Sequence, residues 1–362
     1  MSEMDTRQLR VYLQLALTCK QNWPVSPRSI GMNFVSAISL AGPHVLVTST
    51  FPDALNRNPG IRSDLAEGFA ELLGAERVAQ TPLELADAAI RASRPDVVVA
   101  VGSLVPDLAD LRALRRAVDA VGGVLIFWLT DDPYEFDYAF KAELYADIVV
   151  SNDSWAAQHY RHPDVHHLPL AAAPNRHFRP IVPVAERETV LFFCGVAYPN
   201  RIALMRRIDD LLCRHVVEIL GAGWPDTLRC AVNRRLTPAQ MADYAAAARL
   251  TLNIGRDLDV ANRRLSLPQA TPGPRTFEVA LSGSAQAFFV TGLEVCEHFE
   301  PDTEILLVDG AADIARAIER SLDEPAGIEA IARRAQARAL RDHTYRHRAA
   351  RLLDLSHLTV MA

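Results

Sequence analysis

Apolar runs and stretches of helical spacing alternate along the first half of the chain. Short apolar runs such as DVVVAV at 96–101 and VLIFWL at 124–129 are typical of strands covered on both faces, as in a parallel sheet. Between these runs, apolar side chains recur at the period of an amphipathic helix. Strands are predicted at 11–17, 44–48, 96–101, 124–129 and 146–150, and helices at 65–73, 83–92 and 108–121.

Residues 168–188 interrupt this alternation. The segment has no periodic pattern and holds Pro169, Pro174, Pro180 and Pro183, which is typical of a hinge or linker. The alternation then restarts. Strands are predicted at 189–194, 216–220, 250–254, 287–290 and 304–308, and helices at 201–214, 237–248, 274–281, 311–322, 328–340 and 344–355.

A repeated strand–helix order predicts two doubly wound α/β domains. We expect a Rossmann-like N-terminal domain at 1–170, a hinge at 171–188 and a second Rossmann-like domain at 189–342. A terminal helix at 343–362 is expected to pack back on the first domain. Ligands of such sheets bind at the carboxyl ends of the strands, so two facing domains place both sets of loops in one cleft.

Composition narrows the class of protein. A chain of 362 residues exceeds the usual size of one domain, and its net charge of -6 argues against a protein that coats nucleic acid. No apolar run reaches the ~18–20 residues of a membrane span, and the polar, acidic start MSEMDTRQLR is unlike a secretory signal. We therefore expect a cytoplasmic protein. Its five cysteines form no CxxC pair, which favours buried free thiols over a zinc site or a disulfide framework.

One candidate phosphate site is the segment from Gly195 to Arg201, between a predicted strand and a predicted helix. Glycine allows a close backbone approach, and the helix start offers free N–H groups to an anion. Arg201 adds a donor suited to phosphate oxygens. The alternative is an ordinary turn whose arginine faces solvent. A second candidate loop, 27–33, contains Gly31 and Asn33 and could equally be a plain loop.

Two groups of acidic residues are also candidates. Glu278, in the first turns of the predicted helix at 274–281, could accept the hydroxyls of a ribose, or could simply be a capping glutamate that the helix dipole favours. Asp131 and Asp132 follow a predicted strand. Two adjacent carboxylates repel, which raises one pKa and suits a general base; the alternative is that Asp132 stabilises a turn before Pro133.

Several longer strings together suggest a family. FFCGVAYPNR, GAGW, GPRTFEVALSGSAQAFFVTGLEVCEHFEPDTEILLVD and RDHTYRHR, within residues 189–350, resemble the glycosyltransferase module of the CgeB-like spore-maturation family. The segment from Trp128 to Pro133 resembles a W-x-x-D-D-P motif that precedes that module. The resemblance implies a GT-B glycosyltransferase fold with the nucleotide-sugar donor on the second domain.

The resemblance also implies roles for single residues. Gly195, Tyr198 and Arg201 would lie near the diphosphate, Gly221 and Gly223 would line the nucleotide pocket, and Arg275 and Thr276 would contact phosphates or sugar. Glu278 would hold the ribose. An acid expected eight positions before Glu278 is missing, because residue 270 is alanine. The stereochemical course of the reaction therefore stays open.

The predicted function is transfer of a sugar from a nucleoside-diphosphate-sugar to a hydroxyl or amine, without a metal or other cofactor. Arginines would neutralise the leaving diphosphate, and Asp257-Leu258-Asp259, despite its DxD letters, is interpreted as a solvated loop. Expected partners are the donor and an unknown acceptor, with no nucleic acid. The alternatives are a nucleotide-sugar epimerase of the same fold and a non-catalytic nucleotide-sugar-binding partner subunit.

Overall fold

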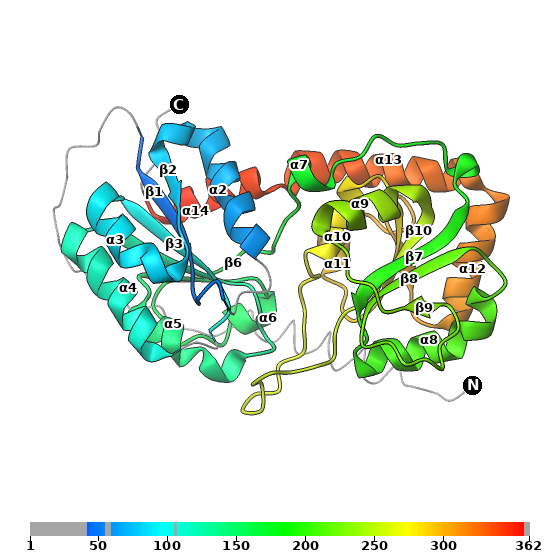
Figure 1. The fold of residues 1–362 in the computed structure, drawn as a ribbon, viewed down its shortest axis with the longest axis horizontal. Helices are drawn as coiled ribbons and strands as arrows, with labels where there is room; N and C mark the ends of the chain where they lie inside the picture. Colours follow the sequence, from blue (N-terminus) through cyan, green and yellow to red (C-terminus); the bar gives the residue numbers. More distant parts are fainter. Residues whose placement is uncertain (1–41, 55–58, 105–106, 358–362) are drawn as a thin grey trace, which may run out of the picture. The chain divides into compact units, whose positions relative to one another are not determined.

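The computed structural model describes residues 42–54, 59–104 and 107–357. They contain two six-stranded parallel sheets, one in each half of the chain (Figure 1). The α/β fold class is therefore confirmed. The predicted strand at 11–17 and the predicted loop at 27–33, with Gly31 and Asn33, lie outside the described residues.

The first sheet has the strand order β2-β1-β3-β4-β5-β6. Its strands are β1 (Val45–Ser49), β2 (Val78–Gln80), β3 (Val97–Gly102), β4 (Val124–Leu129), β5 (Ile148–Ser151) and β6 (Val165–His167). Its helices are α2 (Pro59–Leu73), α3 (Leu83–Ser93), α4 (Leu108–Val121), α5 (Phe140–Tyr145) and α6 (Ser154–Ala157).

The continuous apolar runs of this lobe form strands because helices bury both faces of the sheet. Alternate residues of β4 point to opposite sides. Ile126 and Trp128 pack with α2, whereas Leu125 and Phe127 pack with α3, α4 and α5. Every residue of β3 is buried, as the run at 96–101 predicts.

The second sheet has the order β12-β11-β10-β7-β8-β9. Its strands are β7 (Thr189–Val196), β8 (Val217–Ala222), β9 (Ala231–Val232), β10 (Ala248–Asn253), β11 (Ala285–Phe289) and β12 (Leu306–Val308). Its helices are α8 (Pro199–Leu212), α9 (Pro238–Ala247), α10 (Arg275–Leu281), α11 (Val295–His298), α12 (Ala311–Asp323) and α13 (Pro325–Asp342).

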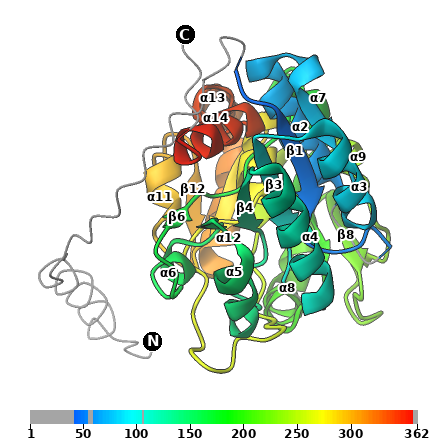
Figure 2. The same ribbon diagram turned by 90° about the vertical axis from the view of Figure 1, so that its left-hand side faces the viewer.

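The C-terminal helix of the described chain returns to the first sheet. After α13, helix α14 (Tyr345–Leu355) packs beside α2 (Figure 2). Tyr345 and Leu352 join the apolar core on that face of the first sheet. The buried Arg348 donates to the carbonyl oxygens of Pro169 (2.7 Å) and Leu170 (3.0 Å), which holds α14 to the segment that leaves the first sheet.

Some boundaries differ from those that the sequence predicts. Strands β2, β6 and β9 have only two or three residues each and carry no pattern long enough to be recognised. The predicted hinge contains the short helix α7 (Pro174–His177). β7 extends through Val196, so the turn predicted from Gly195 begins two residues later. Among the described residues, no helix is both long and apolar enough to cross a membrane.

Candidate functional site

A cavity of about 350 Å³ lies at the carboxyl ends of strands from both sheets, which is where ligands of open α/β sheets bind. Its volume is within the usual range for a small-molecule site. Asp131 and Tyr134, after β4, contribute to one wall. The residues that line the rest include Gly195, Val196, Tyr198, Arg201, Asn253, Gly255, Arg256, Gln269, Pro272, Gly273 and Arg275.

Arg201 lines this cavity but already binds backbone oxygens. Its guanidinium donates to the carbonyl oxygens of Ile254 (2.7 Å) and Val196 (3.0 Å). Burial lowers the pKa of Arg201 to about 10, which leaves the group charged at neutral pH. Arg201 thus links the start of α8 to the residue that follows β10. Because these backbone oxygens already occupy several of its N–H groups, fewer of them are available to a ligand than the sequence prediction assumes.

The start of α8 is occupied by the protein itself. The Asp257 carboxylate accepts a hydrogen bond from the backbone N–H of Asn200 (3.1 Å), in the first turn of the helix. A carboxylate is favoured there by the helix dipole. The predicted anion site at this helix start is therefore filled by an acidic side chain, and a phosphate would have to displace it. Asp257 is exposed, in agreement with the solvated loop predicted at 257–259.

A second arginine, Arg256, holds the two walls of the cavity together. Its guanidinium lies 3.6 Å from the centre of the Tyr134 ring and forms an ion pair with Asp131 (3.1 Å). The Tyr134 hydroxyl donates to Gln269 (2.5 Å). Burial raises the pKa of Tyr134 to about 12, so the phenol stays neutral. The site thus places a cation, an acid and a hydroxyl around one face of the cavity.

The acidic pair after β4 is split by the fold. Asp131 lines the cavity, whereas Asp132 is 1% exposed and does not. Asp132 accepts hydrogen bonds from the hydroxyls of Ser151 (2.7 Å) and Tyr160 (2.8 Å). Its pKa is raised to about 7, chiefly by burial. Repulsion from Asp131 is therefore not the cause that the sequence suggests, and Asp132 lies behind the cavity wall.

The start of α10 brings another predicted group together. Arg275 lines the cavity and forms an ion pair with Glu278 (3.3 Å), which does not line it. His177 Nε2 lies 3.9 Å from the Glu278 carboxylate, and burial lowers the pKa of His177. Thr276 is fully buried and its hydroxyl accepts from the Asn253 amide (2.9 Å). In this arrangement Glu278 orients Arg275, and Thr276 holds the cavity-lining Asn253.

The predicted glycines serve the packing of β7 against β8. Gly195 and Gly221 face each other in register. A Cβ on Gly221 would lie 1.8 Å from the carbonyl oxygen of Gly195, and Gly221 has φ 152°. A Cβ on Gly195 would lie 2.7 Å from Nη1 of Arg201. Gly195 lines the cavity, whereas Gly221 and Gly223 do not. These two glycines therefore do not contact this cavity, as the predicted role in a nucleotide pocket would require.

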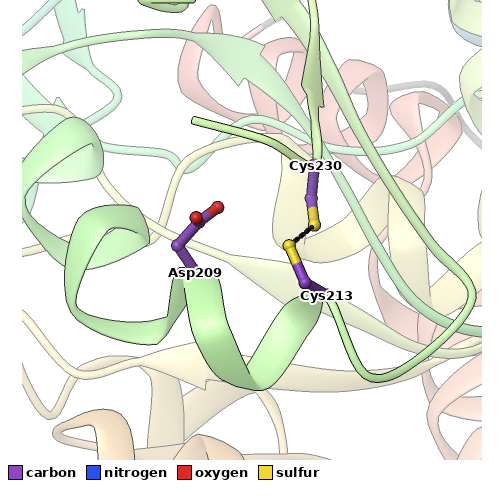
Figure 3. A group of neighbouring side chains, drawn as sticks. All are labelled: Asp209, Cys213 and Cys230. Atoms are coloured by element: carbon purple, nitrogen blue, oxygen red, sulfur yellow. Dashed lines mark hydrogen bonds between the residues drawn. The ribbon is translucent and has the colours of Figure 1, made fainter. Parts of the chain in front are cut away.

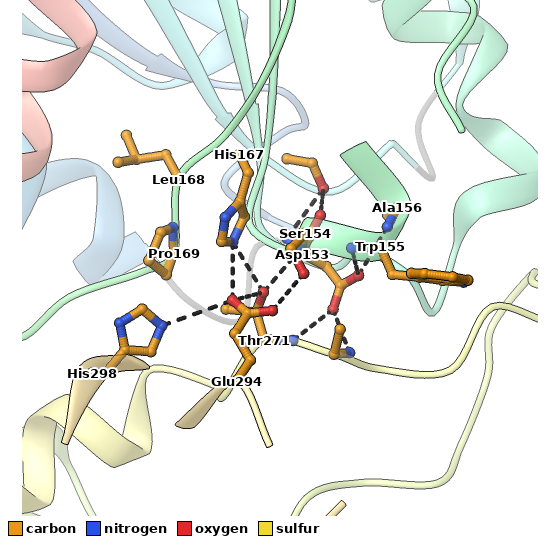
Figure 4. A network of polar contacts seen from close by, with 12 residues as sticks. Asp153, Ser154, Trp155, Ala156, His167, Leu168, Pro169, Thr271, Glu294 and His298 are labelled. Atoms are coloured by element: carbon orange, nitrogen blue, oxygen red, sulfur yellow. Dashed lines mark hydrogen bonds and ion pairs between the residues drawn. The ribbon is translucent and has the colours of Figure 1, made fainter. Parts of the chain in front are cut away.

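A polar cluster joins the lobes beside the cavity, as Figure 4 shows for Asp153, Ser154, Thr271 and Glu294. The buried Asp153 carboxylate caps α6 through the N–H groups of Trp155 and Ala156 (3.0 and 2.9 Å). Its other oxygen accepts from the N–H groups of Ala270 and Thr271 (2.8 and 3.0 Å). Asp153 thereby fixes the loop that continues as Pro272–Arg275.

Glu294 makes several further contacts in this cluster. Glu294 accepts from Thr271 Oγ1 (2.7 Å) and from the Ser154 hydroxyl, and lies 3.5 Å from His167 Nε2. Burial opposes ionisation of Glu294, but the nearby His298 (3.8 Å) and these hydrogen bonds lower its pKa overall. The sequence did not identify Asp153 or Glu294 as site residues, although Asp153 is a residue type that commonly caps helices.

The thiols differ from the buried set that the sequence predicts. Cys213 and Cys296 are exposed, and Cys194 and Cys230 are half-buried; Cys19 lies outside the described residues. The part of the chain that the structure describes holds one group spaced to bind a metal, formed by Asp209, Cys213 and Cys230. None of these three residues lines the cavity.

The fold is that of the GT-B glycosyltransferases. Similar solved structures are sucrose-phosphate synthase from Thermosynechococcus elongatus (12% identity, TM-score 0.57, 86% of this chain and 98% of that one) and AviGT4, a glycosyltransferase involved in avilamycin A biosynthesis (15%, 0.56, 87% and 97%). A putative UDP-N-acetylglucosamine 2-epimerase from Listeria monocytogenes is also similar (12%, 0.53, 88% and 98%). At these identities the likeness shows the fold alone.

Sequence comparison narrows the class. Residues 201–354 match the family model described as glycosyl transferase-like. The chain is also 25% identical, over 186 residues, to the spore protein CgeB of Bacillus subtilis (strain 168), covering 48% of this chain and 57% of that protein. The resemblance to CgeB is thus confirmed, and most of the second half of the chain matches a glycosyltransferase-like family model. The match spans little more than half of the curated relative.

Proposed function

We propose that the protein transfers a sugar from a nucleoside-diphosphate-sugar to a hydroxyl or amine acceptor. The observation that carries this proposal is the cavity, which lies at the strand ends of both sheets and is lined by Arg201, Arg256 and Arg275. Clustered guanidinium groups in a partly closed site fit a diphosphate. The segment that matches the glycosyl transferase-like family model, residues 201–354, contains all three arginines.

In the proposed reaction, Arg256 and Arg275 stabilise the negative charge that develops on the departing diphosphate. Both are oriented before the substrate arrives, Arg256 by Asp131 and the Tyr134 ring, and Arg275 by Glu278. Donors that are fixed in advance stabilise developing charge without reorganisation. Such a set of arginines can replace a metal ion at the diphosphate, so we propose that transfer needs no metal and continues in EDTA.

Asp131 is the proposed general base. It belongs to the first lobe, lines the cavity and is one-third exposed at its side chain (33%), so an acceptor hydroxyl can reach it. The first lobe would then hold the acceptor and the second the donor. A base placed within hydrogen-bonding distance of the acceptor contributes through proton removal as the new bond forms.

Donor binding is the direct test. Calorimetry with UDP, GDP, TDP and CDP is expected to give binding of at least one of them to the wild-type chain. Arg275→Ala is expected to weaken that binding by about 10- to 100-fold, since hydrogen bonds to charged groups contribute ~1.5–3 kcal/mol. Arg333→Ala, on an exposed α13 residue paired with Glu329, is the control. Equal affinities of wild type and Arg275→Ala would contradict the proposal.

Product analysis separates transfer from the alternatives. A sugar transferase releases nucleoside diphosphate from the bound donor faster when an acceptor mixture is added. An epimerase changes the configuration of the sugar while the nucleotide stays attached, and a binding subunit does neither. Either of the last two results would reject the transferase while keeping the nucleotide-sugar site.

A further inference from the structure

Two cysteine thiols meet at the C-terminal end of α8, whereas the cavity residues Tyr198 and Arg201 lie at its N-terminal end. Cys213 follows the last turn of α8, and Cys230 directly precedes the edge strand β9. Their Sγ atoms are 2.7 Å apart and point toward each other (Figure 3). Cys213 is exposed and Cys230 is half-buried, so solvent reagents can reach one thiol of the pair directly.

The backbone on both sides of the pair is already held in place. Arg229 forms ion pairs with Asp209 (2.8 Å) and Asp210 (2.5 Å) in the last two turns of α8. Cys230 packs against the apolar core of the second sheet. Segments that are paired with each other and packed on the core thus bring the two sulfurs to 2.7 Å, a separation that favours a bond between them.

The same three side chains could be read as a metal site, since Asp209 lies with the two thiols. Two observations argue against it. Asp209 is engaged by Arg229, a cation that a metal would have to displace. Two thiolates around a tetrahedral zinc, with Zn–S of about 2.3 Å, keep their sulfurs about 3.8 Å apart, well beyond the separation found here. The pair is arranged for a bond between its sulfurs.

We propose that Cys213 and Cys230 form a reversible intramolecular disulfide by exchange with a small-molecule disulfide such as oxidised glutathione. The Cys213 thiolate attacks one glutathione sulfur, the S–S bond breaks and one glutathione thiolate leaves. Cys230 then loses its proton to solvent and attacks Sγ of Cys213, which releases the second glutathione. The two protein thiols are oxidised, and one glutathione disulfide is reduced to two thiols.

The order of these steps follows from the environments of the thiols. Burial, together with the hydrogen bond to Cys213, raises the pKa of Cys230 to about 12. The exposed Cys213 is therefore the first nucleophile and Cys230 the resolving thiol. The new bond would join the end of α8 to the edge of the second sheet, and would restrict the unfolded chain between the two cysteines.

Alkylation and mass spectrometry test the proposal on the full-length chain. Reduced protein is expected to react at all five cysteines under denaturing conditions. After incubation with oxidised glutathione, Cys213 and Cys230 should be protected, the intact mass should fall by two hydrogen atoms, and one peptide should contain both residues. Oxidation should raise the melting temperature by about 5 °C, reversibly with dithiothreitol.

Variants make the result specific. Cys296→Ser, at another exposed cysteine, should behave as wild type, whereas Cys213→Ser and Cys230→Ser should show no shift on oxidation. Because Cys213 is exposed, its serine variant is expected to fold even if that of Cys230 does not. Equal alkylation of both thiols after oxidation, a stable glutathione adduct on Cys213, or protection of both thiols by Zn²⁺ in the reduced chain would each overturn the proposal. None of these measurements depends on sugar transfer.

Discussion

The carboxylate of Asp257 accepts a hydrogen bond from the backbone N–H of Asn200 at the start of α8 (3.1 Å). An acid from an exposed loop thus lies where the sequence predicts a phosphate. The helix start attracts negative charge in either case, and a donor diphosphate competes with Asp257 for it.

Removal of this competing acid should strengthen nucleotide binding. Asp257→Ala deletes the negative charge and frees the Asn200 N–H, so we expect the nucleoside diphosphate to bind about 3- to 10-fold more tightly, corresponding to ~1 kcal/mol at a helix N-terminus. Calorimetry measures the change. Asp323→Ala, an exposed acid at the end of α12, is the matched control and should leave the affinity unchanged. Weaker binding by Asp257→Ala would show that the acid belongs to the ligand site.

Substitution of the two adjacent aspartates should have different effects on the rate of transfer. Asp131→Asn keeps an oxygen for Arg256 but cannot remove a proton, so kcat for transfer should fall about 10²- to 10⁴-fold with nucleotide binding within about 2-fold of wild type. Asp132→Asn, behind the wall, should keep kcat within a few-fold at pH 7. The opposite ranking of the two variants would move the base to Asp132.

The raised pKa of Asp132 should instead appear in the pH dependence of the free energy of unfolding. Its pKa is about 7 in the folded chain against 3.8 for the free side chain, so the folded state binds more protons between these values. Its contribution to stability is therefore largest below about pH 4 and is lost as pH rises to about 7, with a slope approaching ~1.4 kcal/mol per pH unit.

Denaturant unfolding of wild type and Asp132→Asn across pH 4–8 gives this contribution by subtraction. The free energy of unfolding of the wild type should decline relative to that of the variant as pH rises, and should level off above pH 7. A difference that is flat, or that grows with pH, would mean that Asp132 is charged in the fold.

Gly221 should tolerate no side chain. The Cβ of Gly221→Ala would overlap the carbonyl oxygen of Gly195 at 1.8 Å, and φ 152° disfavours any L residue. β7 and β8 would have to separate, so we expect a loss of more than ~3 kcal/mol of stability or no soluble protein. Gly273→Ala, where a Cβ meets nothing within 4 Å, should change the melting temperature by no more than 1–2 °C.

Asp153 and Asp107 allow a comparison of two helix caps. Both carboxylates cap a helix, but only Asp153 is buried and also holds Ala270 and Thr271. Asp107 is exposed, and Asp107→Ala should lower the free energy of unfolding by about 1 kcal/mol. Asp153→Ala leaves additional buried N–H groups unpaired and should cost about 3 kcal/mol. Chemical unfolding measures both, and equal losses would show that the contact between lobes adds no stability.

The sequence predicts best the strands that are marked by a continuous apolar run. β4 is found at 124–129 as predicted, because a continuous apolar run between helices leaves few alternatives. The segment 255–273 has no such pattern. Its path depends on distant residues: Val260 N–H donates to the Tyr134 carbonyl (2.8 Å), and Asp137 N–H to that of Ala261 (2.8 Å). Sequence therefore could not place Arg256 beside Asp131.

Roles of individual site residues were harder to predict for the same reason. In the sequence Arg201 resembles a free phosphate donor, yet its guanidinium is bound by the carbonyl oxygen of Ile254, 53 residues away and directly after β10. Asp131 and Asp132 are equivalent in the sequence, and only the close contacts of Ser151 and Tyr160 distinguish them.

Helix α14 has a consequence for how the chain matures. The apolar layer on one face of the first sheet contains Ala349, Leu352 and Leu353, from near the end of the chain. During synthesis that layer stays incomplete until α14 has left the ribosome, by which time the residues of the second sheet have all emerged. The apolar core of the first sheet is therefore completed only after the second sheet has been synthesised, and a premature stop after α13 would leave that apolar face open to solvent.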